Sequence, residues 1–91
     1  MDTVLGQVVF SKAGRDAGKR FVIVGIVDSM YVLISDGNLR RIEKPKKKKK
    51  KHLELSETVI ESIGNRLLTG QKVSNADIRK ALAELDGTMN S

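Results

Sequence analysis

The sequence lacks cysteine and tryptophan, and among its 91 residues it has only one proline, one histidine, one tyrosine and two phenylalanines. Without cysteine there is no disulfide framework and no thiolate metal site. The single histidine, His52, follows a run of lysines, and no serine, histidine and carboxylate arrangement indicates a catalytic triad. We therefore predict that the protein is not an enzyme, with no catalytic residues, no metal site and no cofactor.

Long hydrophobic runs are also absent. The longest one, residues 21–27 counting Gly25, is far shorter than the about 20 residues that span a bilayer. The first residues show no basic segment followed by the apolar segment of a signal peptide. The lysine run at residues 46–51 has no apolar anchor beside it that would hold it on a membrane. We expect no membrane partner and a cytoplasmic location.

Positive charge is concentrated in one part of the chain. The net charge is +6, but residues 1–53 contain 13 Lys and Arg against five Asp and Glu, whereas residues 54–91 contain four against six. Such asymmetry is typical of a basic module that meets a polyanion, followed by an acidic extension. We predict two parts, a basic domain over residues 1–55 and a helical extension over residues 56–91.

The basic part begins with a strand–loop–strand pattern. Two apolar runs at residues 5–10 and 20–27 are rich in valine and isoleucine, which favour strands. The second run is almost unbroken, which predicts a central strand covered on both faces. Gly14 and Gly18 in the loop between them permit the positive φ that a tight connection needs.

The next segments predict further strands. An apolar segment at residues 30–35 is followed by Asp36-Gly37, a strong hairpin signal, and then by an alternating segment at residues 39–43. Pro45 interrupts pairing because it has no N–H group, and residues 52–55 have the alternation of a short fifth strand. Together these segments predict a mainly β fold, a small SH3-like barrel of about five strands, followed by two short helices.

The apolar spacing changes to that of a helix after residue 55. Ser56 is a candidate N-cap and Gly70 a candidate end for a first helix, although Gly64 weakens it. Its apolar stripe comprises Val59, Ile60, Ile63 and Leu67.

A second helix has clearer signals. Ser74 is a candidate N-cap, Asp77 occupies the third helical position, and Val73 and Ile78 have the spacing of a hydrophobic staple. Gly87 is the predicted end of this helix.

Four segments, in order and spacing, resemble a known family. They are residues 14–19 (GRDAGK), 31–37 (YVLISDG), 39–45 (LRRIEKP) and 51–53 (KHL). The stretch from residue 6 to residue 27 resembles a KOW motif, and residues 4–55 as a whole resemble the KOW-containing large-subunit ribosomal proteins of archaeal and eukaryotic type. The resemblance implies an SH3-like barrel that binds RNA at or near the ribosome, and it implies nothing about residues 56–91.

Basic residues are the candidates for contact with RNA, since lysine binds phosphate as a mobile point charge and arginine makes bidentate contacts. We expect the arginines to orient the RNA and the lysines to supply affinity. Asp16 is expected to brace its loop, by accepting backbone N–H groups or by pairing with Arg15. The candidate RNA-binding residues are Lys12, Arg15, Lys19, Arg20, Arg40, Arg41, Lys44, Lys46, Lys47, Lys48, Lys49, Lys50, Lys51 and His52, and the candidate turn residues are Gly14, Gly18, Asp36 and Gly37.

Alternatives remain open for several of these features. A block of lysines is often a solvated segment without a partner, and Tyr31 is as well suited to the core as to the surface. The few aromatic residues favour structured RNA over single strands as the partner, because little surface is available for stacking. A protein-interaction module, using the barrel and the apolar face of the C-terminal helices, is the alternative function, with the ribosome or a protein as partner.

Overall fold

The chain folds into a five-stranded antiparallel sheet followed by two helices, in a computed structural model that describes residues 3–12 and 14–90, with side chains as far as Leu85. The mainly β fold with two C-terminal helices predicted from the sequence is confirmed. Within the described ranges, no helix has the length and apolar character needed to cross a membrane. The elements are β1 (Gln7–Ser11), the 3₁₀ helix η1 (Gly14–Asp16), β2 (Arg20–Ile26), β3 (Tyr31–Ser35), β4 (Lys46–Lys49), the 3₁₀ helix η2 (Lys50–His52), β5 (Leu53–Val59), α1 (Glu61–Leu68) and α2 (Asn75–Asn90).

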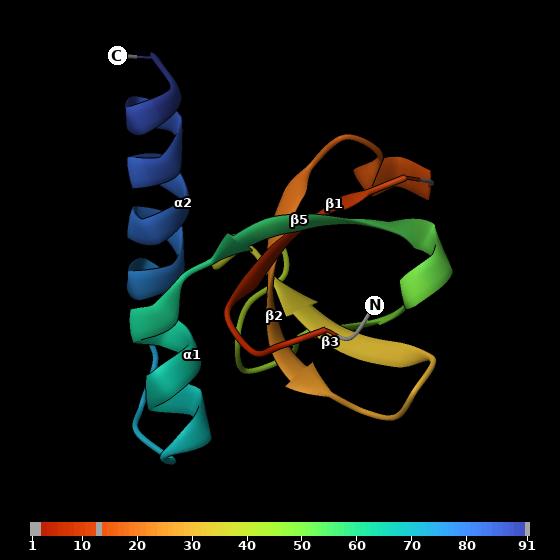
Figure 1. Ribbon diagram of the computed structural model, residues 1–91, viewed down its shortest axis with the longest axis horizontal. Helices are drawn as coiled ribbons and strands as arrows, with labels where there is room; N and C mark the ends of the chain where they lie inside the picture. The colour runs from red at the N-terminus through yellow and green to blue at the C-terminus, as the bar shows by residue number, and fades with distance from the viewer. Residues whose placement is uncertain (1–2, 13, 91) are drawn as a thin grey trace.

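The strands lie in the order β4-β3-β2-β1-β5, so β2 is at the centre of the sheet (Figure 1). Phe21, Val22 and Ile23 are fully buried on β2 although neighbouring side chains point to opposite faces. The prediction of a central strand covered on both faces is therefore confirmed.

Each face of the sheet carries its own core. The inner cluster lies inside the curve of the sheet and comprises Val9, Phe21, Ile23, Val32, Ile34 and Leu53. The outer cluster joins the sheet to the helices and comprises Val8, Val22, Ile63, Val73, Ile78 and Leu82. Figure 1 shows α1 and α2 together on one side of the sheet, where their apolar faces are covered.

Position 64 requires glycine because of a close backbone contact, and this requirement outweighs the low helix propensity of glycine. A Cβ atom on Gly64 would lie 2.5 Å from the carbonyl oxygen of Leu5. The N–H of Ile60 donates to the carbonyl of Gly6 at 2.8 Å, so the backbone of α1 touches the segment before β1. Only a residue without a side chain permits this approach.

The start of α2 follows the predicted signals. Ser74 Oγ accepts the N–H of Asp77 at 3.1 Å, and Asp77 Oδ2 accepts the N–H of Ser74 at 3.0 Å, which is a reciprocal capping box. These bonds hold the pKa of Asp77 below its ordinary value. The predicted end at Gly87 is wrong, because α2 continues to Asn90.

The predicted strand at residues 39–43 is wrong, because this segment belongs to a loop over residues 36–45. Its backbone groups bond within turns or to α2: the N–H groups of Asp36 and Gly37 donate to the Arg40 carbonyl, and the Ile42 N–H donates to Asn75 Oδ1 at 2.8 Å. Ile42 packs against the outer cluster. The alternating apolar and polar residues that predicted a strand therefore belong to a loop that is bonded to α2.

The first helix begins later than predicted. Ser56 does not cap it but lies in β5, where its Oγ donates to the Val8 carbonyl at 2.6 Å. Val59 also belongs to β5, and α1 begins at Glu61. The predicted division between residues 55 and 56 thus falls inside a strand that pairs with β1.

Candidate nucleic-acid interface

The lysine run forms the outermost strand of the sheet. In β4, Lys46 and Lys48 lie opposite Ile34 and Val32 of β3. Residues paired across antiparallel strands project to the same face, so these two lysine stems extend over the inner cluster while their ammonium groups stay at the surface. The uncharged part of the side chain explains how a run of lysines adds a strand to a sheet.

The other two lysines of β4 project to the opposite face, beside Tyr31. The ammonium nitrogen of Lys47 lies 4.8 Å from the centre of the Tyr31 ring, and that of Lys49 lies 5.8 Å away. Both distances are within the range of a cation–π contact. The alternation of β4 therefore presents positive charge on both sides of this strand.

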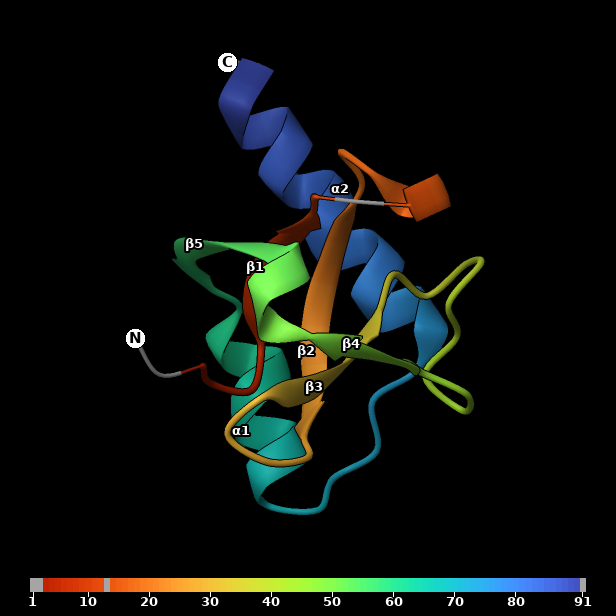
Figure 2. The ribbon, with the colours of Figure 1, turned by 90° about the vertical axis from the view of Figure 1, so that its right-hand side faces the viewer.

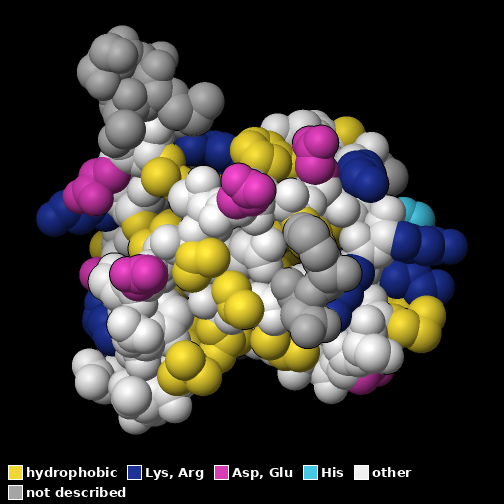
Figure 3. All heavy atoms as spheres, in the orientation of Figure 1, with side chains coloured by type: hydrophobic (Ala, Val, Ile, Leu, Met, Phe, Trp, Pro, Cys, Tyr) yellow, Lys and Arg dark blue, Asp and Glu magenta, His cyan; other side chains and the backbone are white. Residues whose placement is uncertain are grey.

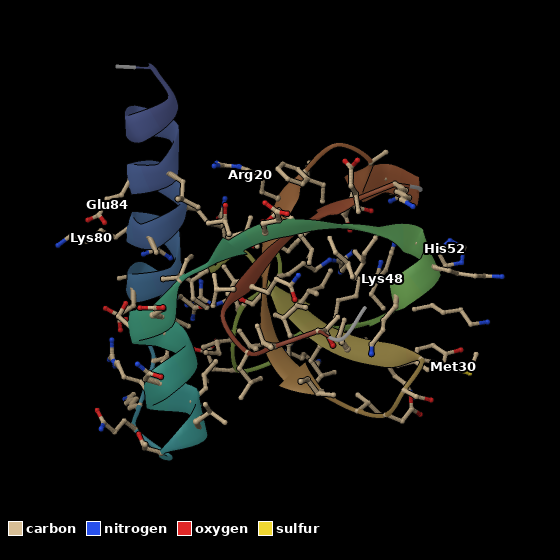
Figure 4. The ribbon with its side chains drawn as sticks, viewed as in Figure 1. Arg20, Met30, Lys48, His52, Lys80 and Glu84 are labelled. Carbon is tan, nitrogen blue, oxygen red and sulfur yellow. The ribbon has the colours of Figure 1, made fainter. Side chains whose placement is uncertain are left out.

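The positive charge of the lysine run continues into η2 and extends to Lys12, which follows β1. The Lys12 N–H donates to the His52 carbonyl at 2.9 Å, and the Lys50 N–H donates to the Met30 carbonyl at 2.8 Å. Figure 4 shows His52 and Met30 at the end of the molecule opposite α2, which carries Lys80. Lys12, Lys51 and His52 are exposed.

Asp16 ties two further cations to this end of the molecule. Its carboxylate is largely buried and accepts a hydrogen bond from Arg40 Nη2 at 3.2 Å, while the ammonium group of Lys46 lies 3.8 Å away. Burial alone would raise the pKa of Asp16, but the hydrogen bond from Arg40 and the charges of Arg40, Lys46 and Lys19 hold the pKa below its ordinary value. The carboxylate of Asp16 therefore links its loop to Arg40 and Lys46, and not to the backbone N–H groups or the Arg15 side chain that were expected to be its partners.

These contacts bring residues far apart in the sequence to one end of the molecule. Figure 2 shows η1, β4 and η2 on the side turned to the viewer, with α2 behind the sheet. In Figure 3 several Lys and Arg side chains gather beside the histidine, at the end remote from the helices, while others lie at the helical end. Arg15 is exposed in η1, next to Asp16. We call the surface formed by Lys12, Arg40, Lys46–Lys51 and His52 the basic face; it follows the edge strand β4 and includes lysines from both sides of this strand.

Lys19 and Arg20 lie beside a different feature, a groove between the sheet and α2. The groove has a volume of about 470 Å³ and includes Arg79 of α2 in its wall. Arg20 Nη1 donates to the Leu82 carbonyl at 3.1 Å. Arg79 Nη1 donates to the Gly37 carbonyl at 2.6 Å, so both guanidinium groups link α2 to the sheet or its loops.

Arg41 lies beside Glu43 and the start of α2 and is not gathered with the basic face. Arg41 Nε lies 3.6 Å from Glu43 Oε2, and both side chains are exposed. Glu43 accepts hydrogen bonds from the Asn75 side-chain amide at 2.8 Å, and these bonds lower its pKa, aided by the charge of Arg41. Lys44 is exposed in the turn before β4. Arg40 and Arg41, both candidate RNA-binding residues, thus pair with different carboxylates, Asp16 and Glu43.

The turn residues have the geometry that their roles require. Gly14, Gly18 and Gly37 have φ between 73° and 83°. Asp36 Oδ1 accepts the N–H groups of Asn38 and Arg40, each at 2.9 Å.

Two features of the site were missed by sequence reasoning. Arg79 was not singled out, although it follows Asn75 by four residues, a spacing that places both on one side of a helix. The pairing of Asp16 with Arg40 joins residues 24 positions apart, and no local signal indicates it.

No protein-family model matches the chain, so its likeness to the KOW family stays a prediction. Among the side chains that the structure describes, those of residues 3–12 and 14–85, no three of His, Cys, Asp or Glu are grouped in a way that would hold a metal ion.

Proposed function

We propose that this protein is a non-catalytic RNA-binding protein whose basic face grips the phosphate backbone of structured RNA. The observation that carries the proposal is the ordered row of six lysines in β4 and η2, with Arg40 and Lys12 brought beside it. A cytoplasmic role at or near the ribosome follows from the resemblance to KOW-containing ribosomal proteins.

Ordered cations suit a phosphate backbone for a physical reason. Each phosphate neutralised by a lysine or arginine releases condensed counterions, and this release favours binding whatever the RNA sequence. Strand and 3₁₀ geometry hold the backbone of the lysine run, so less chain entropy is lost on binding than for a loose tail. Lys47 and Lys49 on one side of β4, and Lys46 and Lys48 on the other, offer charge over a broad surface.

Structured RNA is favoured over extended single strands. Phe21 is fully buried and Phe10 is half-buried on β1, so little aromatic surface is offered for successive stacked bases. A surface dominated by charge recognises shape and phosphate.

The alternative function, a protein-interaction module, is favoured by one observation. An apolar groove of about 360 Å³ lies between α1 and the sheet, with Val4, Ile26 and Leu68 in its wall exposed by 45%, 48% and 72%. The apolar faces of the helices themselves are not available, because Ile63, Ile78 and Leu82 are buried against the sheet. A protein partner would therefore use the groove.

The experiment compares two variants with the same loss of charge. Lys47→Gln with Lys51→Gln removes two exposed cations from the basic face, and Lys72→Gln with Lys80→Gln removes two exposed cations from the segment before α2 and from α2. Binding of a folded RNA hairpin is followed by fluorescence anisotropy over a range of salt concentrations. The logarithm of the affinity should fall with the logarithm of the salt concentration, by roughly 0.7–0.9 for each phosphate contact.

We expect the first double variant to lower that slope by roughly 1.5 and the second to leave it unchanged. Equal effects of the two variants would show that the charge acts without a defined surface. Absence of RNA binding by the unmodified protein, together with a protein complex that Leu68→Asp disrupts, would favour the alternative.

A further inference from the structure

Tyr31 is held in a fixed position at the edge of the basic face. The turn before it is closed by Asp28, whose Oδ1 accepts the N–H of Met30 at 2.8 Å and the N–H of Tyr31 at 2.9 Å. These two bonds lower the pKa of Asp28, so its carboxylate stays charged to a lower pH than that of an aspartate without them. The Val27 N–H donates to the Tyr31 carbonyl at 3.1 Å and completes the hairpin.

The ring of Tyr31 lies on the outer face of the sheet, among lysines. Its neighbour Val32 is fully buried and projects inward, so Tyr31 projects outward, where it is half-buried. Lys47 and Lys49 lie within cation–π range of the ring. Tyr31 is thus an aromatic residue whose ring lies beside the ammonium groups of two β4 lysines.

A small groove shares Lys49 with the surroundings of this ring. It has a volume of about 220 Å³ and is lined by Ser29, Met30 and Lys49–Lys51. Met30 is 51% exposed, and Figure 4 shows it at the same end of the molecule as His52. The thioether and the lysine stems make an apolar floor, and the ammonium groups supply positive charge around it.

We propose that Tyr31 and this groove receive one unpaired nucleobase of an RNA, which stacks on the ring while its flanking phosphates pair with Lys49–Lys51. This inference rests on the proposed function and narrows its ligand to structured RNA that carries a bulged or looped-out nucleotide. An apolar surface beside mobile cations matches the two chemical halves of a nucleotide, a flat base and a charged phosphate.

The lysines over the ring do not prevent this binding. An exposed cation–π contact is weaker than the stacking of a base on an aromatic ring. A lysine stem is flexible, so an ammonium group displaced by the base can move to the phosphate beside it. Stacking of the base therefore replaces a weak lysine–ring contact with a stronger base–ring contact, and the displaced ammonium group still binds a phosphate.

The test uses the fact that Tyr31 is the only tyrosine in a chain without tryptophan. Intrinsic fluorescence excited in the tyrosine band therefore reports on this one ring. Two RNA hairpins serve as probes, one with a fully paired stem and one with the same stem and a single bulged adenine. Affinities are measured for the unmodified protein, Tyr31→Leu and Tyr31→Phe, with circular dichroism to verify that each variant is folded.

We expect the bulged hairpin to bind about tenfold more tightly than the paired one and to quench the tyrosine fluorescence. Tyr31→Leu should remove this advantage and leave the affinity for the paired hairpin unchanged, whereas Tyr31→Phe should retain it, because a phenyl ring also stacks. Met30→Ala should reduce the advantage in part.

Three results would overturn the inference. Equal affinity for the two hairpins, with fluorescence unchanged on binding, would leave the proposed function standing and remove the stacking site. An equal loss on both hairpins in Tyr31→Leu would make Tyr31 a structural residue only. Absence of binding to either hairpin by the unmodified protein would remove the proposed function and this inference with it.

Discussion

Replacing Gly37 with alanine tests whether α2 holds the loop over residues 36–45. Gly37 has a φ of 73°, and a side chain in this left-handed conformation costs about 1–2 kcal/mol. A Cβ atom there would also lie 2.4 Å from the Asn75 carbonyl oxygen and 3.2 Å from Ile78 Cβ, both in α2. Because the Asn75 oxygen belongs to the helix backbone, the loop and α2 would have to move apart.

Gly18→Ala is the matched control. Gly18 has a similar φ of 83°, but a Cβ atom there would meet nothing within 4 Å. It should therefore cost only the conformational term of about 1–2 kcal/mol. Overpacking adds typically about 1–3 kcal/mol, so Gly37→Ala should cost about 2–5 kcal/mol in total.

The free energy of unfolding is measured by urea titration and the melting temperature by circular dichroism. In a domain of this size, a loss of 1 kcal/mol lowers the melting temperature by about 4–8 °C, so the two variants should melt roughly 10 °C apart. Equal losses, within about 0.5 kcal/mol, would refute the conclusion that α2 packs on this loop.

Three further predictions concern stability. Gly64→Ala should destabilise the protein because its Cβ would meet the Leu5 carbonyl, although helix propensity alone predicts a gain of about 1 kcal/mol; a higher urea midpoint would contradict the close approach of the two backbones. Ser74→Ala should cost about 1 kcal/mol through loss of the cap to Asp77, and an unchanged midpoint would mean that the cap contributes nothing. Asp16 has a lowered pKa, so its stabilising effect is present above its ordinary pKa of 3.8 and is lost as the pH falls through its lower folded value. The stability difference between the unmodified protein and Asp16→Asn should therefore be largest near neutral pH and shrink in acid, and urea midpoints that differ equally at both pH values would oppose this.

The parts of the fold that were predictable from sequence depend on local patterns. The apolar run of β2 and the capping signals at Ser74 and Asp77 each indicate structure within a few residues, and both match the observed elements. A hydrophobic run or a cap is decided by neighbours in the chain, so it is visible without knowledge of the fold.

The errors occur where distant residues decide the outcome. Residues 39–43 alternate like a strand, but the Ile42 N–H bonds to Asn75, 33 positions further along the chain. Ser56 resembles a cap, yet its hydroxyl bonds to Val8, 48 positions away. Local propensity competes with such long-range bonds, and tertiary packing prevails.

The candidate site was predictable in its residue types and less so in its geometry. Charge asymmetry pointed to the basic half of the chain, and the lysine run proved to be ordered in β4 and η2. The sequence gives no sign that Asp16 would collect Arg40 and Lys46, or that Arg41 would turn toward Glu43. Ion pairs depend on which loops meet, and loop placement is the least local property of this fold.

The position of β4 at the edge of the sheet has a consequence for how copies of the protein meet. The unpaired backbone groups of an edge strand are a template on which a second chain can assemble, and proteins often protect such a strand with charge. Here four adjacent lysines make two such edge strands repel each other. At physiological ionic strength this repulsion acts over about 8 Å, which is longer than the spacing of about 4.8 Å between paired strands. A bound polyanion would cancel it, so the same row that keeps free molecules apart would let them crowd together along a shared nucleic acid.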